Sequence, residues 1–269
     1  CRATATSDLV LESRQVVEEG AFPIRKMPVR VLGMAQASHD VMVIQLQLPA
    51  NDSFQFRAGQ YIDFLLRDGA RRSYSMANAP HTLVAGSPSV ELHIRHMPGG
   101  KFTDHVFGAM KEKDIQRVEG PQGSFYLRED SDAPIVLLAS GTGFAPIKAL
   151  MEHMQHKDIS RPTRLYWGGR RPADLYMHDW VLAQLPLMPH LQYIPVVSDA
   201  LPEDAWTGRT GFVHKAALQD TPSLAGHQVY ACGAPIVVDS AKRDYVASGL
   251  PEDDFFADSF TSEADKAAV

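Results

Sequence analysis

The sequence predicts two folded units in series, an antiparallel β-barrel followed by a parallel α/β sheet. Short alternating strand patterns, separated by turn residues, fill the first half of the chain. From about residue 131, strands and helical stretches alternate four times, which is typical of a parallel sheet with right-handed crossovers. The length of 269 residues, at roughly 150 residues per domain, also indicates about two domains.

Several strands and one helix are expected in the first half. Alternating apolar residues mark two strands, at Met42, Ile44, Leu46 and Leu48 and again at Val90, Leu92 and Ile94. Residues 27–35 and 60–66 are further strand candidates, and residues 103–110 are expected to be helical. Short strands between turn signals indicate an antiparallel sandwich or barrel.

The second half begins with a continuous apolar run at residues 134–139, which is typical of a strand buried on both faces. The acidic stretch 129–133 is expected to be the boundary between the units. Further strands are expected at 164–167, 191–197 and 227–231, and helices at 145–154, 173–185, 211–218 and 236–247. Residues 262–269 are small and polar, and we expect a flexible tail.

Composition and charge exclude several classes of protein. Lys and Arg number 26 against 32 Asp and Glu, and a net charge of −6 argues against a nucleic-acid-binding protein. We expect no membrane span or signal peptide, because no apolar run approaches the ~20 residues that cross a bilayer. Cys1 and Cys232 form no disulfide framework, which fits a cytoplasmic protein. The histidines do not cluster, and His93, His96 and His105 are expected on the barrel surface or in a loop, without a catalytic role.

The segment Arg72-Ser73-Tyr74-Ser75, with Asn78 beyond it, is the first candidate binding site. An Arg can bind a pyrophosphate through its planar fork. A Tyr two residues further on can stack on a flat ring, and the next Ser can hydrogen-bond a ring nitrogen. The alternative is a basic, aromatic edge strand.

Residues 98–103 (PGGKFT) are the second candidate. Consecutive glycines bring backbone N–H groups close to an anion, and the helix that follows offers its positive end to a phosphate. The alternative is a tight hairpin loop with an N-cap at Thr103.

Residues 141–146 (GTGFAP) follow the buried strand directly and begin a helix, which is the context of a phosphate-binding loop. Pro146 occupies the third glycine position of the full pattern, and the alternative is an ordinary turn between strand and helix. Cys232 and Gly233 repeat this arrangement after the last predicted strand. A buried Cys there can equally be a small apolar residue, and no ligand spacing supports a metal site. Residues 254–260 are either an aromatic lid over a cofactor or a last strand.

In this order the motifs resemble those of the ferredoxin–NADP⁺ reductase superfamily, over about residues 27–261. The resemblance implies a flavin-binding Greek-key barrel at 26–130 and a Rossmann-like NAD(P)H-binding domain at 131–261. It also implies that Arg72 binds the FAD pyrophosphate, Tyr74 stacks on the flavin and Ser75 lies near the flavin N5. The implied cofactor-binding set is Arg72, Ser73, Tyr74, Ser75, Asn78, Gly99, Gly100, Lys101, Phe102, Thr103, Gly141, Thr142, Gly143, Arg170, Cys232, Gly233 and Phe260.

The resemblance further implies that hydride passes from NAD(P)H to FAD, with Ser75, Cys232 and Phe256 as the catalytic residues around the two cofactors. Arg170 or Arg171 could pair with the 2′-phosphate of NADPH. Asp174 would repel that phosphate, so NADH is expected, with NADPH as the alternative.

The start of the chain, Cys1-Arg2-Ala3 and residues 7–11, resembles the region of the last cluster cysteine in plant-type ferredoxins. Residues 1–25 would then be the end of an upstream [2Fe–2S] domain plus a linker. Cys1 would be one of four ligands, so the cluster could form only in a longer native chain.

The overall pattern is most similar to the CDP-6-deoxy-Δ3,4-glucoseen reductase group and to oxygenase reductases. The implied partner is an electron-acceptor protein, either a dehydrase or an oxygenase component. A free flavin reductase, a flavohaemoglobin-type module and a non-catalytic redox-sensing subunit are the alternatives.

Overall fold

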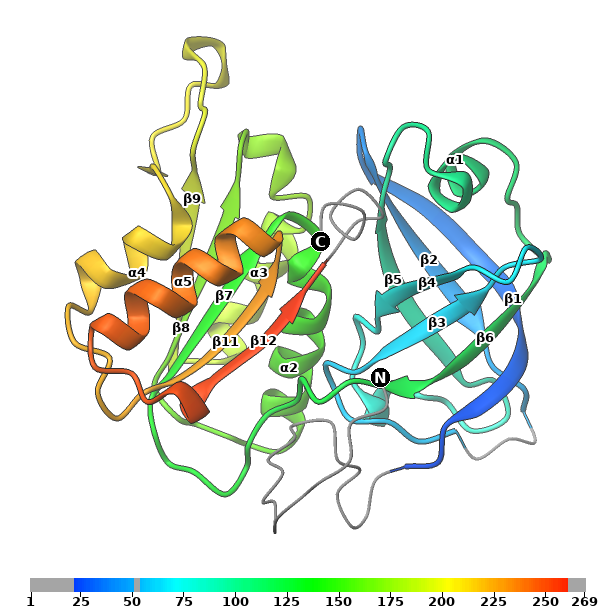
Figure 1. Cartoon of the computed structure of the whole chain (residues 1–269), viewed down its shortest axis with the longest axis horizontal. Helices are drawn as coiled ribbons and strands as arrows, with labels where there is room; N and C mark the ends of the chain where they lie inside the picture. The colour runs from blue at the N-terminus through cyan, green and yellow to red at the C-terminus, as the bar shows by residue number, and fades with distance from the viewer. Residues whose placement is uncertain (1–21, 51–53, 261–269) are drawn as a thin grey trace, which may run out of the picture.

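The computed structural model describes residues 22–50 and 54–260. Cys1, most of the predicted 1–25 segment and the 262–269 tail lie outside the described residues. Two six-stranded sheets make up two domains that stand side by side (Figure 1). The predicted fold class, an antiparallel barrel followed by a parallel α/β domain, is confirmed.

The first domain is a closed antiparallel barrel. Its strands are β1 (Arg25–Ser38), β2 (Val41–Gln47), β3 (Tyr61–Leu65), β4 (Arg71–Ser75), β5 (Ser89–Arg95) and β6 (Ile115–Gln122). They pair in the order β4-β3-β6-β1-β2-β5. An isolated bridge between Met76 and Leu92 joins the two ends of this order. Helix α1 (Lys101–Gly108) lies across one end of the barrel (Figure 1).

The two faces of β5 differ, as strand alternation requires. Val90, Leu92 and Ile94 are completely buried in the barrel core. Glu91, His93 and Arg95 occupy the alternate positions. The expectation that His93 lies on the barrel surface or in a loop is wrong. It is 4% exposed, because the second domain covers this face of the strand.

The second domain is a parallel sheet with helices on both faces. Its strands are β7 (Ile135–Ser140), β8 (Thr163–Gly169), β9 (Leu191–Val197), β10 (Arg209–Thr210), β11 (Gln228–Gly233) and β12 (Phe255–Ser259). Helices α4 (Val213–Asp220) and α5 (Pro235–Ala247) cover one face, and α2 (Phe144–His156) and α3 (His178–Gln184) the other. Helix α2 lies between this sheet and the barrel (Figure 1).

The strand order β10-β9-β8-β7-β11-β12 contains one reversal of direction. From β7 the chain moves outward through β8 and β9, and then it returns to the other side of β7 with β11. In open α/β sheets, ligands bind beyond the carboxyl ends of the strands at such a switch point. The loops after β7 and β11 are therefore where a ligand is expected.

Two of the differences between the predicted and the observed elements have a clear physical reason. Strand β6 was not predicted, because Val118 is its only buried residue with a large apolar side chain and its pattern carries no alternation. The helix expected at 173–185 is shorter. A single-turn 3₁₀ segment, Pro172–Asp174, precedes α3, and another, Leu185–Leu187, follows it around Pro186.

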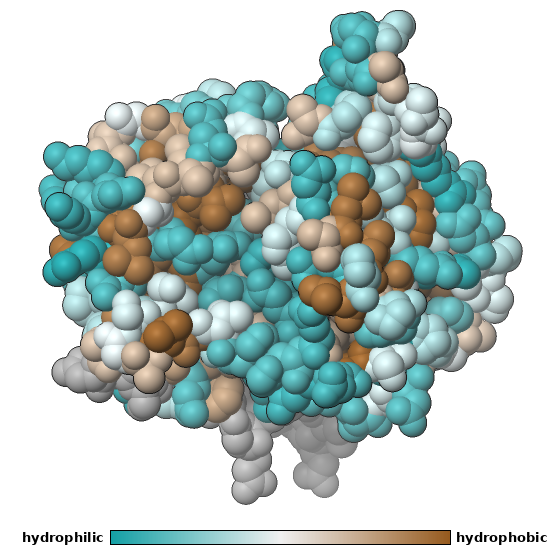
Figure 2. Space-filling view, turned by 180° about the vertical axis from the view of Figure 1, so that it is seen from behind, coloured by the Kyte–Doolittle hydropathy of each residue, from teal (hydrophilic) through white to brown (hydrophobic). Residues whose placement is uncertain are grey.

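The molecular surface carries both polar and apolar residues. Seen from behind, apolar residues interrupt the polar surface in separate patches over both domains (Figure 2). Exposed Leu182 and Leu187, on and just after α3, are among the apolar residues outside the core. Within the described residues, every helix is too short or too polar to cross a membrane.

Candidate active site

The two domains meet at a pair of polar side chains, the buried Ser75 and the partly buried Asp258. Ser75 ends β4 of the barrel and donates a hydrogen bond from Oγ to Asp258 Oδ2 at 2.9 Å. Asp258 lies on β12, in register with Cys232 on β11. Burial raises the pKa of Asp258 to about 6, against the lowering effect of the Ser75 hydrogen bond. This carboxyl group therefore gives up its proton at a higher pH than an exposed aspartate does.

Asp258 was missed by the sequence analysis, although Phe256 and Phe260 were selected. Residues 256, 258 and 260 alternate along β12 and its continuation, so a period of two would have grouped them. The ring of Phe256 stacks on Tyr230 at 4.9 Å between centroids and lies under the Arg128 guanidinium. Phe260 follows β12, and its N–H donates to the carbonyl oxygen of Gly233 at 2.9 Å. Phe260 therefore lies at the switch point, whereas Phe256 lies two strand positions before Asp258.

Tyr74 belongs to a cluster of three aromatic rings. Its centroid lies 5.5 Å from that of Phe102 and 5.8 Å from that of Phe64. The cluster joins β3, β4 and the start of α1. Burial raises the pKa of the Tyr74 phenol, which remains protonated. This packing holds β4 against α1, and both elements carry predicted binding residues.

The other predicted residues of β4 have polar partners. Ser73 Oγ donates to Asp63 Oδ1 at 2.6 Å, on the neighbouring strand β3. Arg72 is half-buried, and its Nη1 donates to the carbonyl oxygen of Arg71 at 2.7 Å. Asn78, beyond the strand, donates both amide hydrogens, to Thr82 Oγ1 at 2.8 Å and to the Ser89 carbonyl at 3.2 Å. The side chain of Asn78 thus braces the turn that follows β4.

The glycine pair before α1 presents backbone to solvent. Gly99 has φ +84°, and a Cβ at this position would contact nothing within 4 Å. Helix α1 begins after Gly100, which has no side chain to cap it, and the Asp104 carboxylate of the first turn accepts the Gly99 N–H at 3.1 Å. Thr103 is not the N-cap, since its Oγ1 donates to the Met97 carbonyl at 2.9 Å and closes the loop. Lys101 extends into solvent and pairs with Asp68 at 2.9 Å. This helix start is a suitable place for a phosphate group.

The loops after β7 and β11 pack against each other through backbone. A Cβ on Gly143 would lie 2.2 Å from the Cys232 carbonyl oxygen. A Cβ on Gly233, which has φ +131°, would lie 2.2 Å from Ser140 Oγ. That hydroxyl accepts a hydrogen bond from the Ala234 N–H at 2.9 Å. Side chains at either glycine would force the loops apart.

Cys232 lies inside this contact rather than in the open crevice expected from the sequence. It is buried between β7 and β12. Burial raises the pKa of its thiol well above the usual value, and the nearby Asp258 adds to the effect. A protonated, buried thiol is a poor nucleophile. The residue contributes its backbone and its small volume to the site.

Arg170 and Arg171 follow β8, and both have carboxylate partners. Arg170 is 83% exposed in its side chain, and its Nε lies 3.2 Å from Asp199 Oδ2. Arg171 pairs with Asp204 through two contacts of 2.7 Å. Asp174 accepts the backbone N–H groups of both arginines. The region that would meet the adenosine ribose is therefore acidic as well as basic.

Arg95 is a further candidate that the sequence analysis did not select. It ends β5 of the barrel, and its Nε pairs with Asp40 Oδ2 at 3.0 Å. Its guanidinium lies directly beside the glycine loop, since a Cβ on Gly141 would be 2.8 Å from Nη1. Arg95 of the barrel thus places a positive charge beside the glycine loop of the second domain.

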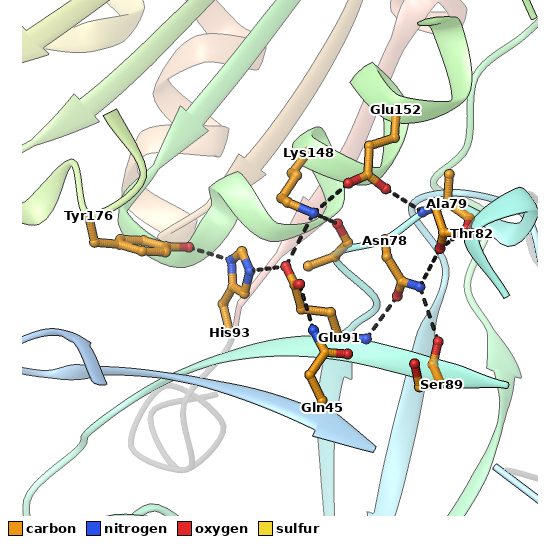
Figure 3. Close-up of polar contacts among 11 residues, drawn as sticks. Gln45, Asn78, Ala79, Thr82, Ser89, Glu91, His93, Lys148, Glu152 and Tyr176 are labelled. Carbon is orange, nitrogen blue, oxygen red and sulfur yellow. Dashed lines mark hydrogen bonds and ion pairs between the residues drawn. The ribbon is translucent and has the colours of Figure 1, made fainter. Parts of the chain in front are cut away.

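A buried polar cluster lies behind the glycine loop (Figure 3). It joins β5 of the barrel to α2 and to the segment before α3, through Glu91, His93, Lys148, Glu152 and Tyr176. The sequence analysis missed this cluster, because its members are far apart in the chain and each is unremarkable alone.

Comparison with known proteins decides the family. A model of the oxidoreductase FAD-binding domain matches residues 28–126, and a model of the oxidoreductase NAD-binding domain matches residues 137–243. CDP-6-deoxy-L-threo-D-glycero-4-hexulose-3-dehydrase reductase of Yersinia pseudotuberculosis is 38% identical over 263 residues, which are 97% of this chain and 76% of that protein. This chain belongs to the ferredoxin reductase family.

Two further relatives support the assignment of this chain to the family. Terephthalate 1,2-dioxygenase reductase component 2 of Comamonas sp is 34% identical over 264 residues, 97% of this chain and 76% of the relative. The cytochrome P450 reductase GcoB of Amycolatopsis superposes with a TM-score of 0.81 at 31% identity, covering 89% of this chain and 71% of GcoB. The predicted resemblance is confirmed. The reductase is an oxidoreductase with an FAD-binding barrel and an NAD-binding α/β domain.

Proposed function

We propose that this reductase takes hydride from NADH and passes electrons singly to a partner protein, a dehydrase or oxygenase component. The observation that carries the proposal is the Ser75–Asp258 contact, where the end of an FAD-domain strand meets the switch point of the NAD domain. Relatives named as reductases of a hexulose dehydrase and of a dioxygenase support the choice of partner.

The residues present fit FAD. Arg72 offers positive charge and the start of α1 offers N–H groups for its pyrophosphate, and the space beside the Gly99 Cα leaves room for it. Tyr74 offers a ring held in place by Phe64 and Phe102. When bound, FAD supplies the conversion of a two-electron hydride donor into single electrons. The protein's part is to hold the two cofactors in line.

The nucleotide would bind across Gly141, Thr142 and Gly143, next to the Arg95 guanidinium. NADH is preferred over NADPH in this proposal. Arg170 and Arg171 already have carboxylate partners, and those carboxylates would repel a 2′-phosphate.

Asp258 orients the Ser75 hydroxyl by accepting its hydrogen bond. Burial raises the pKa of this partly buried carboxyl group to about 6, so it holds a proton to a higher pH than an exposed aspartate does. We assign Ser75 and Asp258 together as the polar pair at the reacting centre.

The electron route beyond the flavin is part of the proposal. The likeness of the Cys1 segment to a plant-type ferredoxin favours a [2Fe–2S] centre as the first acceptor, in a longer native chain. The dehydrase or oxygenase component would then receive electrons from that centre.

The test is an absorption spectrum of the purified chain, with and without added FAD, followed by anaerobic NADH. We expect a flavin spectrum that NADH bleaches. A protein that takes up no FAD would contradict the proposal. Flavin that separates on gel filtration would favour a free flavin reductase, and flavin that stays oxidised with NADH would favour a non-catalytic subunit.

A further inference from the structure

Three residues on the polar face of β5 contact the NAD domain. Glu91 reaches α2, His93 reaches the segment before α3, and Arg95 reaches the glycine loop. Three alternate residues of one barrel strand thus contact three segments around the nucleotide site. We call Glu91, His93, Lys148 and Tyr176 the β5 clamp (Figure 3).

His93 links Glu91 to Tyr176 through two hydrogen bonds, one at each ring nitrogen. Its Nε2 lies 2.8 Å from Glu91 Oε1, and its Nδ1 lies 2.8 Å from the Tyr176 hydroxyl. Burial lowers the pKa of His93, so the ring is neutral and carries one proton. Burial alone would raise the pKa of Glu91, but the His93 hydrogen bond and the Lys148 charge lower it to about 2. Because the carboxylate can only accept, His93 carries its proton on Nε2 and accepts from Tyr176 at Nδ1.

Lys148 completes the clamp from α2. Its side chain is 5% exposed, and its Nζ contacts Glu152 Oε1 at 2.6 Å, the Ala77 carbonyl at 3.1 Å and Glu91 Oε1 at 3.2 Å. The three N–H donors of the ammonium group therefore have three acceptors, two of them in the barrel. A buried charge with fixed partners tolerates little displacement.

Tyr176 connects the clamp to the glycine loop through packed rings. Its ring meets Trp167 edge-on at 5.4 Å and Phe144 at 6.5 Å between centroids. Phe144 begins α2 and stacks on Trp167 at 4.0 Å. The Trp167 Nε1–H donates to the Gly141 carbonyl at 3.0 Å. A shift of Tyr176 therefore reaches Gly141 through buried, close-packed groups.

We propose that the β5 clamp positions the glycine loop, and with it the nicotinamide nucleotide, at the distance from the barrel that hydride transfer requires. This inference rests on the proposed function and adds residues that act through the loop rather than on the cofactors. Rates of transfer between bound groups fall steeply with misplacement, by up to roughly 100-fold for 1 Å.

The decisive variant is Tyr176→Phe, which removes one hydroxyl and keeps the ring packing. Tyr193→Phe is the matched control, because the Tyr193 hydroxyl also meets a histidine, His178 Nδ1 at 3.1 Å, but within the NAD domain. Stopped-flow reduction of the FAD-loaded chain by NADH and by 4-deuterated NADH would be measured over a range of concentrations. For Tyr176→Phe we expect the limiting rate to fall about 10-fold, with the half-saturating NADH concentration unchanged and a larger deuterium isotope effect.

The results distinguish failure of the positioning role from failure of the proposed reductase function. Equal rates and isotope effects for Tyr176→Phe and Tyr193→Phe would overturn the positioning role while leaving the reductase function intact. A wild-type flavin that NADH does not reduce would overturn both. Lys148→Met, with surface Lys242→Met as its control, should reproduce the slower transfer with normal FAD content, and a normal rate in Lys148→Met would also contradict the clamp.

Discussion

The barrel side of the site offers side chains, whereas the NAD-domain side offers mainly backbone. On β4, Tyr74 and Ser75 present a ring and a hydroxyl that partners can contact directly. In the loops after β7 and β11, Gly143 and Gly233 pack so closely that no side chain fits. A substitution in β4 therefore removes a contact, while a substitution in the loops moves the walls of the crevice.

The strongest test of this difference is Gly143→Ala. The new methyl group would overlap the Cys232 carbonyl, and backbone cannot move aside as a flexible side chain can. We expect a loss of about 3 kcal/mol in the free energy of unfolding and near-complete loss of NADH-driven flavin reduction. Urea unfolding and anaerobic reduction measure the two effects. Gly33→Ala on β1, where a Cβ meets nothing within 4 Å, is the control and should leave both unchanged.

Asp258→Asn tests the polar pair between the two sides. The folded-state pKa of about 6 lies above the unfolded value, so native Asp258 binds more protons and wild-type stability falls as pH rises from about 4 through 6. Asn carries no charge and avoids this loss. Relative to wild type, the free energy of unfolding of Asp258→Asn should be little changed below pH 4 and about 2 to 3 kcal/mol higher above pH 6. Denaturant unfolding at pH 4 and pH 7 measures it, and an equal difference at both pH values would contradict the assignment.

Tyr74→Ala removes a side chain from the barrel side without moving the loops. Loss of the ring should weaken FAD binding by at least about fivefold, because aromatic stacking contributes about 1 kcal/mol beyond the area buried. Fluorescence titration of the apoprotein with FAD measures the change. Tyr74→Phe keeps the ring and should bind FAD normally, and equal affinities for both variants would exclude stacking at this position.

Asp204→Ser should have the smallest effect. It removes the bidentate partner of Arg171, which then becomes available to a 2′-phosphate. A surface ion pair of this kind contributes little, so we expect about a threefold gain in kcat/KM for NADPH relative to NADH. The gain should vanish in the Arg171→Ala, Asp204→Ser double variant, and a gain that persists there would rule out Arg171 as its source.

Strand alternation predicted which residues enter the barrel core but not what covers the opposite face. Val90, Leu92 and Ile94 were correctly placed on one face of a strand, yet His93 was assigned to the surface or a loop. An apolar pattern reports burial inside one domain, whereas His93 is buried by the other. The two barrel partners of Lys148, Glu91 and Ala77, are 57 and 71 positions away in the sequence, so only the assembled fold brings them to Lys148.

The predicted glycine loops do follow β7 and β11, and the structure shows a reason for their glycines that the sequence analysis did not consider. Gly143 and Gly233 were predicted to approach a cofactor. In the structure, the absence of a side chain at these positions lets two loops of the protein pack against each other. Spacing alone cannot separate these reasons, because both require a residue without a Cβ.

Helix α2 belongs to the NAD-domain sheet by sequence, yet Lys148 and Glu152 bond to the backbone of Ala77 and Ala79 in the barrel. Separating the domains would break the hydrogen bonds of both side chains with the barrel backbone. The two domains should therefore melt in one transition, and a ligand bound to only one of them raises the melting temperature of both. Heat stability of the nucleotide sheet would then report whether the flavin is in place.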